Sequence, residues 1–260
     1  MKIRSPYDRH DLKIKRNDRV LEIGSGHSPS FRSNVLVEKF VETNYHRCGD
    51  VKIYPHQVFF NADGENLPFR DKEFDYTMCC QVLEHADDPV KFLTEQNRVS
   101  KGGYIEVPSL IGEYLFPKKS HKWVILEIDK KLILYEKALM NENYFCDYSE
   151  MFLNYMPYQS LVYRLLWYTR GDMMNIRYEW KDSIDFVVNP QEDYYLSFFT
   201  KKWDREMTEK IFPPQSMIAD LWSTVQAGIY MTYSQLKVRA FRRYPMTVGE
   251  YMQLKNKNGL

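Results

Sequence analysis

The feature that most constrains this chain is a short apolar run followed by a glycine turn. Residues 20–28 read VLEIGSGHS, which places Glu22 next to Gly24, Ser25 and Gly26. A brief, β-branched run that stops at glycine predicts a buried strand, and glycine lets the backbone turn sharply and approach a ligand. The acidic Glu22 favours a ligand with an amino group over a phosphate. Such turns also serve the fold alone in many α/β proteins, so this stretch leaves both interpretations open.

Other apolar runs add four strands and one helix to the first strand, which we expect at residues 19–24. The further strands are expected at residues 34–40, 57–63, 74–80 and 104–108. Asp88 and Pro89 are typical of a helix start, and this helix is expected to run to about Ser100 and to stop at Gly102 and Gly103. Strands that alternate with helices or loops predict an α/β fold with an open, mostly parallel sheet.

The spacing of the first strands predicts short connections. Only residues 27–33 separate the first two strands, whereas a crossover between parallel strands takes about a dozen residues or more. The first crossover helix is therefore expected to be very short or absent, and residues 41–55 are likewise polar and irregular. Ligands of such sheets bind beyond the carboxyl ends of the strands. We expect one ligand to touch the residues found there, which are Glu22, Gly24, Glu38, Asp63 and Gln81 to His85.

Composition narrows the class of protein. The formal net charge of +1 gives no overall field that would attract nucleic acid or anionic lipid. No stretch of sequence is apolar for long enough to span a bilayer, and the polar N-terminal residues lack the apolar core of a signal peptide, so we expect a cytoplasmic protein. Four cysteines fit no zinc pattern and are expected to be reduced thiols: Cys48, Cys79, Cys80 and Cys146.

After residue 110 the chain becomes rich in aromatic residues. Two hairpins are expected, around residues 129–131 and 181–183, and a helix over 151–167 that is interrupted near Pro157. Residues 218–236 predict an amphipathic helix. Basic residues follow, for which a solvated helix face or tail is favoured over a binding site: Lys237, Arg239, Arg242, Arg243, Lys255 and Lys257.

We divide the chain at residue 112. Residues 1–112 form the predicted cofactor-binding core, and residues 113–260 form a hairpin and helix elaboration that completes the same domain. Because binding residues often lie in insertions over a rigid sheet, we expect the second segment to supply the acceptor side and a lid. The sequence leaves the oligomeric state open.

Residues 20–109 resemble the class I S-adenosylmethionine-dependent methyltransferases that act on small molecules. The first motif is Glu22-x-Gly24-x-Gly26. The others follow in order at fitting distances: residues 63–69 (DGENLPF), Phe74-Asp75, residues 82–85 (VLEH), Asp88-Pro89 and residues 95–103 (EQNRVSKGG). The resemblance implies a Rossmann-like, mostly parallel sheet with shortened first crossovers, and S-adenosylmethionine as the cofactor.

The resemblance also implies roles for the residues at the strand ends. The turn of Gly24, Ser25 and Gly26 would lie against the methionine moiety of the cofactor, whose amino group suits Glu22. Glu38 would bind both ribose hydroxyls, because a carboxylate accepts two hydrogen bonds.

Three further residues complete the implied cofactor site. Asp63 would receive the adenine amino group beside the Gly64 backbone, and Gln81 would approach the methionine end. Ser28 replaces the usual third glycine, which leaves a wider turn.

A dinucleotide dehydrogenase is the obvious alternative for a strand followed by a glycine turn, but the sequence disfavours it. Both the third glycine and the helix N-terminus that would hold a pyrophosphate are missing. The shortened crossovers are similar to those of methyltransferases that modify polysaccharides and other sugars.

An oxygen acceptor requires a general base, and histidine is the commonest one. His85, at the exit of the fourth strand, is the first candidate, although its pairing with Glu84 also occurs as a fold feature of relatives. His121 is the second candidate, with a satisfied polar role as the default. Glu106 and Glu113 are candidates to orient a hydroxyl, but solvent exposure is favoured for both. We expect no metal, although scattered carboxylates do not exclude magnesium.

The leading functional hypothesis is an O-methyltransferase that acts on a small acceptor, a hydroxyl of a sugar or glycan precursor. Methylation of a quinone, a lipid or an amine is the alternative within the same fold. A non-catalytic partner subunit with the same fold is a third hypothesis, against which the aligned acids Glu22, Glu38 and Asp63 speak. A nucleic-acid methyltransferase is disfavoured by the neutral charge.

Overall fold

The protein is described from a computed structural model over residues 1–44, 49–140, 148–240 and 243–258. The irregular stretch predicted around Tyr45 to Cys48, as well as Cys146 and Arg242, lies outside the described residues. The chain forms two compact units. Unit 1 holds Met1–Val107, Tyr178–Ile184 and the chain from Arg243 onward, and unit 2 holds Pro108–Arg177 and Asp185–Arg242. The units differ from the predicted division at residue 112 because two late segments return to unit 1.

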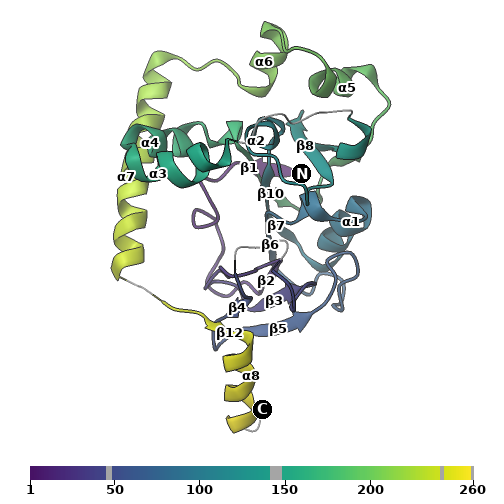
Figure 1. Cartoon of the computed structure of the whole chain (residues 1–260), viewed down its shortest axis with the longest axis vertical. Coiled ribbons are helices and arrows are strands. Elements are labelled where there is room, and N and C mark those ends of the chain that lie inside the picture. Colours follow the sequence, from purple (N-terminus) through teal and green to yellow (C-terminus); the bar gives the residue numbers. More distant parts are fainter. Residues whose placement is uncertain (45–48, 141–147, 241–242, 259–260) are drawn as a thin grey trace. The chain divides into compact units, whose positions relative to one another are not determined.

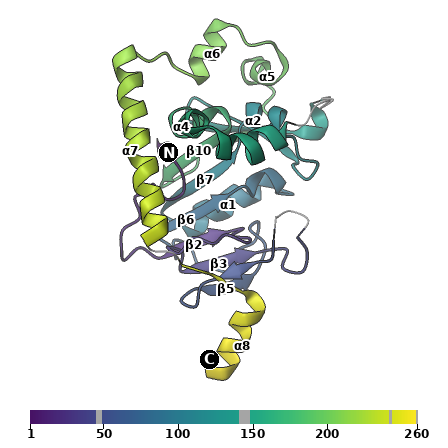
Figure 2. The ribbon, with the colours of Figure 1, turned by 60° about the vertical axis from the view of Figure 1, so that its left-hand side comes forward.

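A seven-stranded sheet is the frame of unit 1. Its strand order is β1-β10-β7-β6-β2-β3-β5 (Figures 1 and 2). The bounds are β1 Lys2–Arg4, β2 Val20–Ile23, β3 Val35–Glu38, β5 Val58–Asn61, β6 Tyr76–Cys80, β7 Gly102–Pro108 and β10 Asn175–Lys181. The pairs β2–β3, β2–β6, β3–β5 and β6–β7 are parallel, whereas β1 pairs with β10 antiparallel. This mostly parallel sheet confirms the predicted fold class.

The connections confirm the predicted short crossovers. No helix occurs in residues 24–34 between β2 and β3, nor in the described residues between β3 and β5. A helix first appears between β6 and β7, as the turn η1 (Leu83–His85) and helix α1 (Pro89–Val99). Asp88 caps α1 by accepting hydrogen bonds from the amides of Val90 and Lys91, as its sequence predicts.

Gly102 and Gly103 do not end the helix as predicted but begin strand β7. The reason is packing against neighbouring strands. A Cβ atom at Gly103 would lie 2.3 Å from Thr77 Oγ1, and one at Gly102 would lie 2.9 Å from the carbonyl oxygen of Trp180. The glycines therefore allow β7 to fit between β6 and β10.

The last described segment of the chain packs against unit 1 through β12 and the first turn of α8. Strand β12 (Met246–Thr247) pairs with β4 (Lys52–Ile53), and helix α8 (Val248–Asn258) follows. Tyr251 of α8 packs with Leu36 and Ile53 in a buried cluster, and its hydroxyl donates to the carbonyl oxygen of Gln57 at 2.8 Å. Tyr251 of this late segment thus packs beside β3 and β4, while most of α8 is exposed.

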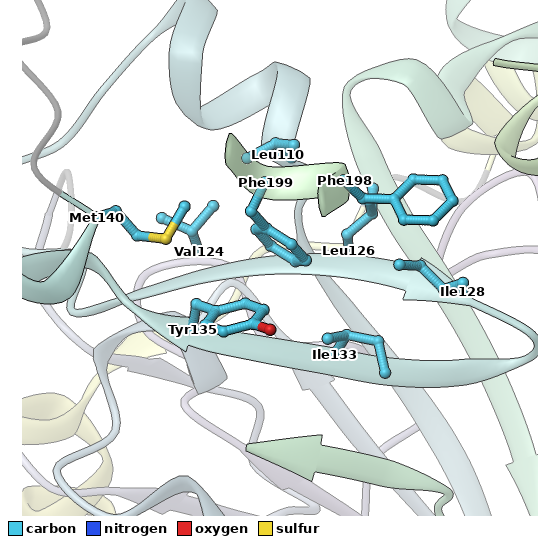
Figure 3. Packing of buried hydrophobic residues seen from close by; sticks show 9 residues of the cluster. All are labelled: Leu110, Val124, Leu126, Ile128, Ile133, Tyr135, Met140, Phe198 and Phe199. Carbon is cyan, nitrogen blue, oxygen red and sulfur yellow. The ribbon is translucent and has the colours of Figure 1, made fainter. Parts of the chain in front are cut away.

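Unit 2 is built on a three-stranded sheet of order β11-β9-β8. The predicted first hairpin is confirmed as β8 (Trp123–Ile128) and antiparallel β9 (Lys131–Glu136). Asp129 and Lys130 make its turn with φ values of 52° and 61°, the mirror-image geometry that matches strand twist. Figure 3 shows the buried side chains that hold this sheet, from α2 (Leu110–Leu115), the hairpin, the turn after it and α5 (Asp193–Thr200): Leu110, Val124, Leu126, Ile128, Ile133, Tyr135, Met140, Phe198 and Phe199.

The predicted second hairpin around residues 181–183 is wrong. Strand β10 belongs to the seven-stranded sheet, whereas β11 (Phe186–Val188) pairs in parallel with β9. Asp182, with a φ of 66°, turns the chain away, and its amide donates to the carbonyl oxygen of Lys101 at 2.8 Å. The residues on both sides of Asp182 alternate as in strands, but β10 pairs within the seven-stranded sheet and β11 pairs with β9.

The remaining helices belong to unit 2. A π-helical segment (Glu150–Tyr155) leads into α3 (Met156–Gln159) and α4 (Leu161–Thr169). The predicted interruption therefore falls at Ser160, which caps α4, while Pro157 is accommodated in the first turn of α3. Helices α6 (Arg205–Ile211) and α7 (Met217–Ala240) follow, and α7 confirms the predicted helix over 218–236. Throughout the described residues, the helices fall short of the length and apolar character needed to cross a bilayer.

Candidate functional site

The parallel strands of unit 1 end at a common edge. Ile23 of β2 is in register with Val37 of β3 and Cys79 of β6, and Cys79 is in register with Ile105 of β7. The residues that follow these positions are therefore neighbours along one side of the sheet. This edge is where a ligand of an open parallel sheet binds.

The glycine turn adopts a backbone that requires glycine. Gly24 and Gly26 have φ values of 70° and 53°, in the left-handed region. The Gly24 amide donates to the carbonyl oxygen of Val37 at 2.8 Å, which ties the turn to β3. A Cβ atom at Gly24 would lie 2.2 Å from Val82 Cγ2, so the turn presses directly on the exit of β6. Ser25 between the glycines is buried.

Gln81 brings the exit of β6 to the same place. Its φ of 58° is unusual for a residue with a side chain, and its amide donates to the carbonyl oxygen of Glu106 at 2.7 Å. The side chain is exposed, and the next residue, Val82, is the one that contacts Gly24. A left-handed non-glycine residue at a strand end is the kind of backbone strain that occurs at functional sites.

Glu38, the last residue of β3, reaches the glycine turn. Its Oε2 atom accepts a hydrogen bond from the Gly26 amide at 3.0 Å. The side chain is partly buried. A carboxylate has about four lone-pair directions, so this contact is compatible with further hydrogen bonds to a ligand.

Glu22 is almost fully buried and holds the loop after the turn. Its Oε2 atom accepts from the Ser30 amide at 2.8 Å and from the Ser33 hydroxyl at 2.7 Å. Burial raises the pKa of Glu22, against the opposing effect of the Arg9 guanidinium and these two donors. Arg9 Nη1 lies 3.9 Å from Glu22 Oε1 and also donates to the carbonyl oxygen of Ser28 at 2.7 Å. Sequence reasoning missed Arg9, because a lone cation in a charged lead-in segment carries no signal.

Asp63 lies in an ion-pair network that the sequence did not predict. Lys39 Nζ lies 2.7 Å from Asp63 Oδ2 and 3.0 Å from Asp87 Oδ2, and the hydrogen bond to Asp63 raises the pKa of Lys39. In the role predicted for Asp63, the amino group of adenine and Lys39 would therefore both contact the Asp63 carboxylate. The signal was present in the sequence, since Lys39 directly follows Glu38 and so lies at the same strand end.

Gly64 and the motif residues after it serve the packing of unit 1. A Cβ atom at Gly64 would lie 2.4 Å from Phe92 Cε2 of α1, so glycine allows the loop to approach this helix. Glu95 accepts from the Leu67 amide at 2.7 Å and pairs with Arg98, which donates to the carbonyl oxygen of Phe69 at 2.6 Å. These contacts fix the loop that carries Asp63.

His85 ends the turn η1 just after β6. Its Nε2 atom lies 4.0 Å from Glu84 Oε1, and its side chain is 14% exposed. Glu84 is buried and His85 partly so. The imidazole therefore follows the strand whose exit contacts the glycine turn, and it lies next to the Glu84 carboxylate.

The second histidine candidate lies in a buried polar cluster of unit 2. His121 Nδ1 lies 2.5 Å from Glu113 Oε2, and Lys137 Nζ lies 2.6 Å from Glu113 Oε1. Burial opposes the ionisation of Glu113, but the hydrogen bonds from His121 and Lys137 outweigh it and lower its pKa. The exposure expected for Glu113 is wrong, because its side chain is 2% exposed. Glu106 is half-buried and accepts a hydrogen bond from the Tyr104 hydroxyl.

Residues 35–106 match the family model of the methyltransferase domain. The match covers the edge described above from β3 to β7, with Glu38, Asp63, Gly64, Gln81 and His85 inside it. It supports the predicted enzyme class and, with it, S-adenosylmethionine as the methyl donor. The first motif, at Glu22 to Gly26, precedes the matched residues.

Relatives share parts of the chain. An uncharacterized protein of Methanocaldococcus jannaschii, MJ1123, is 41% identical over 64 residues, which are 22% of this chain and 31% of that protein. The 27-O-demethylrifamycin SV methyltransferase of Amycolatopsis mediterranei is 29% identical over 119 residues, which are 39% of this chain and 44% of that enzyme. The chain thus spans less than half the length of these curated relatives.

Solved structures are similar over part of the chain as well. The YcgJ protein of Bacillus subtilis is 21% identical with a TM-score of 0.32, over 42% of this chain and 56% of that one. The PH0226 protein of Pyrococcus horikoshii is 16% identical with a TM-score of 0.32, over 47% of this chain and 67% of that one.

Proposed function

We propose that this protein transfers a methyl group from S-adenosylmethionine to a small acceptor, a hydroxyl of a sugar or glycan precursor. The observation that carries the proposal is the Glu38 carboxylate, which ends β3 and accepts a hydrogen bond from the Gly26 amide at 3.0 Å. This carboxylate lies directly beside the glycine turn, which supports a role for Glu38 in binding ribose hydroxyls. The methyltransferase-domain match over residues 35–106 supports the same function.

The residues around the turn fit this cofactor better than a dinucleotide. Two carboxylates, Glu22 and Glu38, belong to the strands on either side of the turn. Like charge would repel a pyrophosphate, whereas an amino group and a diol suit acidic partners. In this proposal Gly24, Ser25 and Gly26 contact the methionine moiety, Glu38 the ribose, and Asp63 and Gly64 the adenine, with Gln81 near the methionine end.

An oxygen acceptor is supported by one relative, because the Amycolatopsis mediterranei enzyme is by name a methyltransferase acting at an O position. The short connection between β2 and β3 is the feature that favours a sugar. In this proposal residues 113–260 supply the acceptor side and a lid. Methylation of a quinone, a lipid or an amine, or a non-catalytic partner role, is the alternative that the experiments below address.

Bound S-adenosylmethionine would supply an electrophilic methyl group, and S-adenosylhomocysteine would leave as the acceptor oxygen bonds to the methyl carbon. The protein then has to orient the acceptor, exclude water and take up the hydroxyl proton. We assign that proton to His85, with Glu84 at 4.0 Å available to stabilise the resulting imidazolium. His121, oriented by Glu113, is the second candidate. We propose that the transfer needs no metal.

Calorimetry tests the cofactor first. S-adenosylmethionine and S-adenosylhomocysteine should bind and NAD should not, and binding of NAD without a response to S-adenosylhomocysteine would overturn the proposal. A methyl-transfer screen against nucleotide sugars, free glycans, quinones and amines then identifies the acceptor. Transfer confined to quinones or amines would replace the sugar assignment, and a lack of cofactor binding in calorimetry would favour the partner role.

A further inference from the structure

Helix α7 turns its apolar side away from the rest of unit 2. Large apolar side chains recur every three or four residues along it, and we call these the α7 stripe: Ile218, Leu221, Trp222, Val225, Ile229, Tyr233 and Leu236. All are exposed, with fractions of 83% at Ile218, 62% at Trp222, 66% at Ile229 and 59% at Leu236. Sequence reasoning takes such a stripe as the buried face of a helix.

The opposite side of α7 is the one that packs. Ala227 and Met231 are buried there, and α7 lies beside α4 (Figure 1). Asp220 pairs with Arg170 at 3.2 Å, and the Tyr230 ring stacks edge-on with Tyr168 at 5.6 Å. At about 100° of rotation per residue, Ala227, Met231 and Asp220 lie roughly opposite the stripe, and Tyr230 lies at its flank, so the exposure of the stripe follows from the way α7 is anchored.

We propose that the α7 stripe is the interface with a second copy of this chain, which packs its own α7 against it in antiparallel orientation. This inference does not depend on the proposed function. At roughly 150 Å² for a large apolar side chain, the exposed fractions give the stripe on the order of 600 Å². That area approaches the roughly 800 Å² per partner of a standard interface and lies at the upper end of the roughly 300–600 Å² of the largest apolar patch on a typical monomer, which is often functional.

The spacing of the stripe suits a helix partner. Steps of three and four residues, from Ile218 to Trp222, Val225 and Ile229, approach the 3.5-residue repeat by which two helices interlock. No position of the stripe is charged, as in the core of an obligate homodimer interface.

The antiparallel orientation follows from self-complementarity, which a two-fold interface requires. About a centre at residue 227, Ile218 lies opposite Leu236 of the second copy, and Val225 lies opposite Ile229. Trp222, the largest side chain of the stripe, then lies opposite the small Thr232. Opposed helix dipoles also favour this arrangement.

A membrane surface is the other class of occupant for an apolar helix face, and the charges of α7 disfavour it. Helices that lie on membranes are rich in Lys and Arg on their polar face. Along the stripe, between residues 217 and 236, α7 has no Lys or Arg, and its basic residues Lys237 and Arg239 come only in the last turn. The exposed polar side chains beside the stripe include the uncharged Gln226 and Gln235.

Light scattering combined with size-exclusion chromatography tests the proposal on the full chain. The expected result is a dimer, with or without S-adenosylhomocysteine. Ile229→Asp should weaken dimerisation at least about a hundredfold, because each interface then buries two unpaired charges. Gln235→Asp is the matched control, since it adds the same charge to an exposed position of the same helix outside the stripe, and it should leave the dimer intact.

A charge swap tests the orientation. Ile218→Glu alone and Leu236→Lys alone should each dissociate the dimer, whereas the double variant should restore it, because position 218 of one copy faces position 236 of the other. Circular dichroism establishes that each variant is folded. A monomeric wild type, or equal effects of Ile229→Asp and Gln235→Asp, would overturn the interface, and so would a monomer that binds phosphatidylglycerol vesicles through Trp222. A double variant that stays monomeric would overturn the antiparallel pairing.

Discussion

Replacing Gly24 with alanine tests how the glycine turn is held against the exit of β6. Gly24 has a φ of 70°, which costs a residue with a side chain roughly 1–2 kcal/mol. The new Cβ atom would also lie 2.2 Å from Val82 Cγ2, and overpacking of this kind costs roughly 1–3 kcal/mol. Gly24→Ala should therefore lower the free energy of unfolding by about 2–5 kcal/mol, and it should weaken cofactor binding because the turn shifts.

A double-mutant cycle with Val82→Ala separates the two causes. Removing the Val82 methyl groups relieves the overlap but leaves the backbone cost of φ. The coupling free energy between the two substitutions should therefore be about 1–3 kcal/mol in favour of the double variant. Urea unfolding followed by circular dichroism measures stability, and calorimetry with S-adenosylhomocysteine measures binding. Additive effects of the two substitutions would refute the contact between the turn and Val82, and a Gly24→Ala variant as stable as the wild type would refute the reasoning altogether.

Three further outcomes are expected. Glu38→Ala should weaken S-adenosylhomocysteine binding by about 1.5–3 kcal/mol for each charged hydrogen bond lost, with Glu38→Gln less affected because it can still accept from Gly26; an unchanged dissociation constant would remove Glu38 from the site. His85→Ala should lower turnover about a hundredfold or more and leave cofactor affinity unchanged; near-normal turnover would assign the general base to His121 instead. EDTA should leave the activity of the wild type unchanged, and a loss of that activity would overturn metal independence. Because the pKa of Glu113 is lowered in the folded protein, its stabilising contribution is present above the unfolded pKa of about 4.3 and is lost as the pH falls through the folded pKa. Glu113→Gln should therefore be less stable than the wild type near neutral pH, with the difference shrinking in acid; a difference independent of pH would contradict the ion pairs with His121 and Lys137.

The sequence by itself determined the elements whose signal is local. The β-branched run before Gly24 became β2, Asp88 and Pro89 began α1 as expected, and the residues between the first strands were too few for a crossover helix. Parallel strands share one carboxyl edge, so the order of the strands also placed Glu38 and Gln81 near the glycine turn. These features depend on periodicity, capping and chain length, which a sequence displays directly.

Only the tertiary structure decided which distant segments meet. The runs on either side of Asp182 have the same alternation as a hairpin, yet one joins β7 and the other β9. Arg9 became the partner of Glu22 through a contact that no local pattern encodes. The sequence places Lys39 at the strand end of Glu38, but its pairing with Asp63 depends on β5 lying beside β3. The periodicity of α7 predicted a helix, but it did not determine which side of the helix faces the rest of unit 2. That choice depends on the contacts made by the side opposite the stripe. Here Asp220 and Tyr230 make that contact with α4, and the apolar side of α7 is left to a partner.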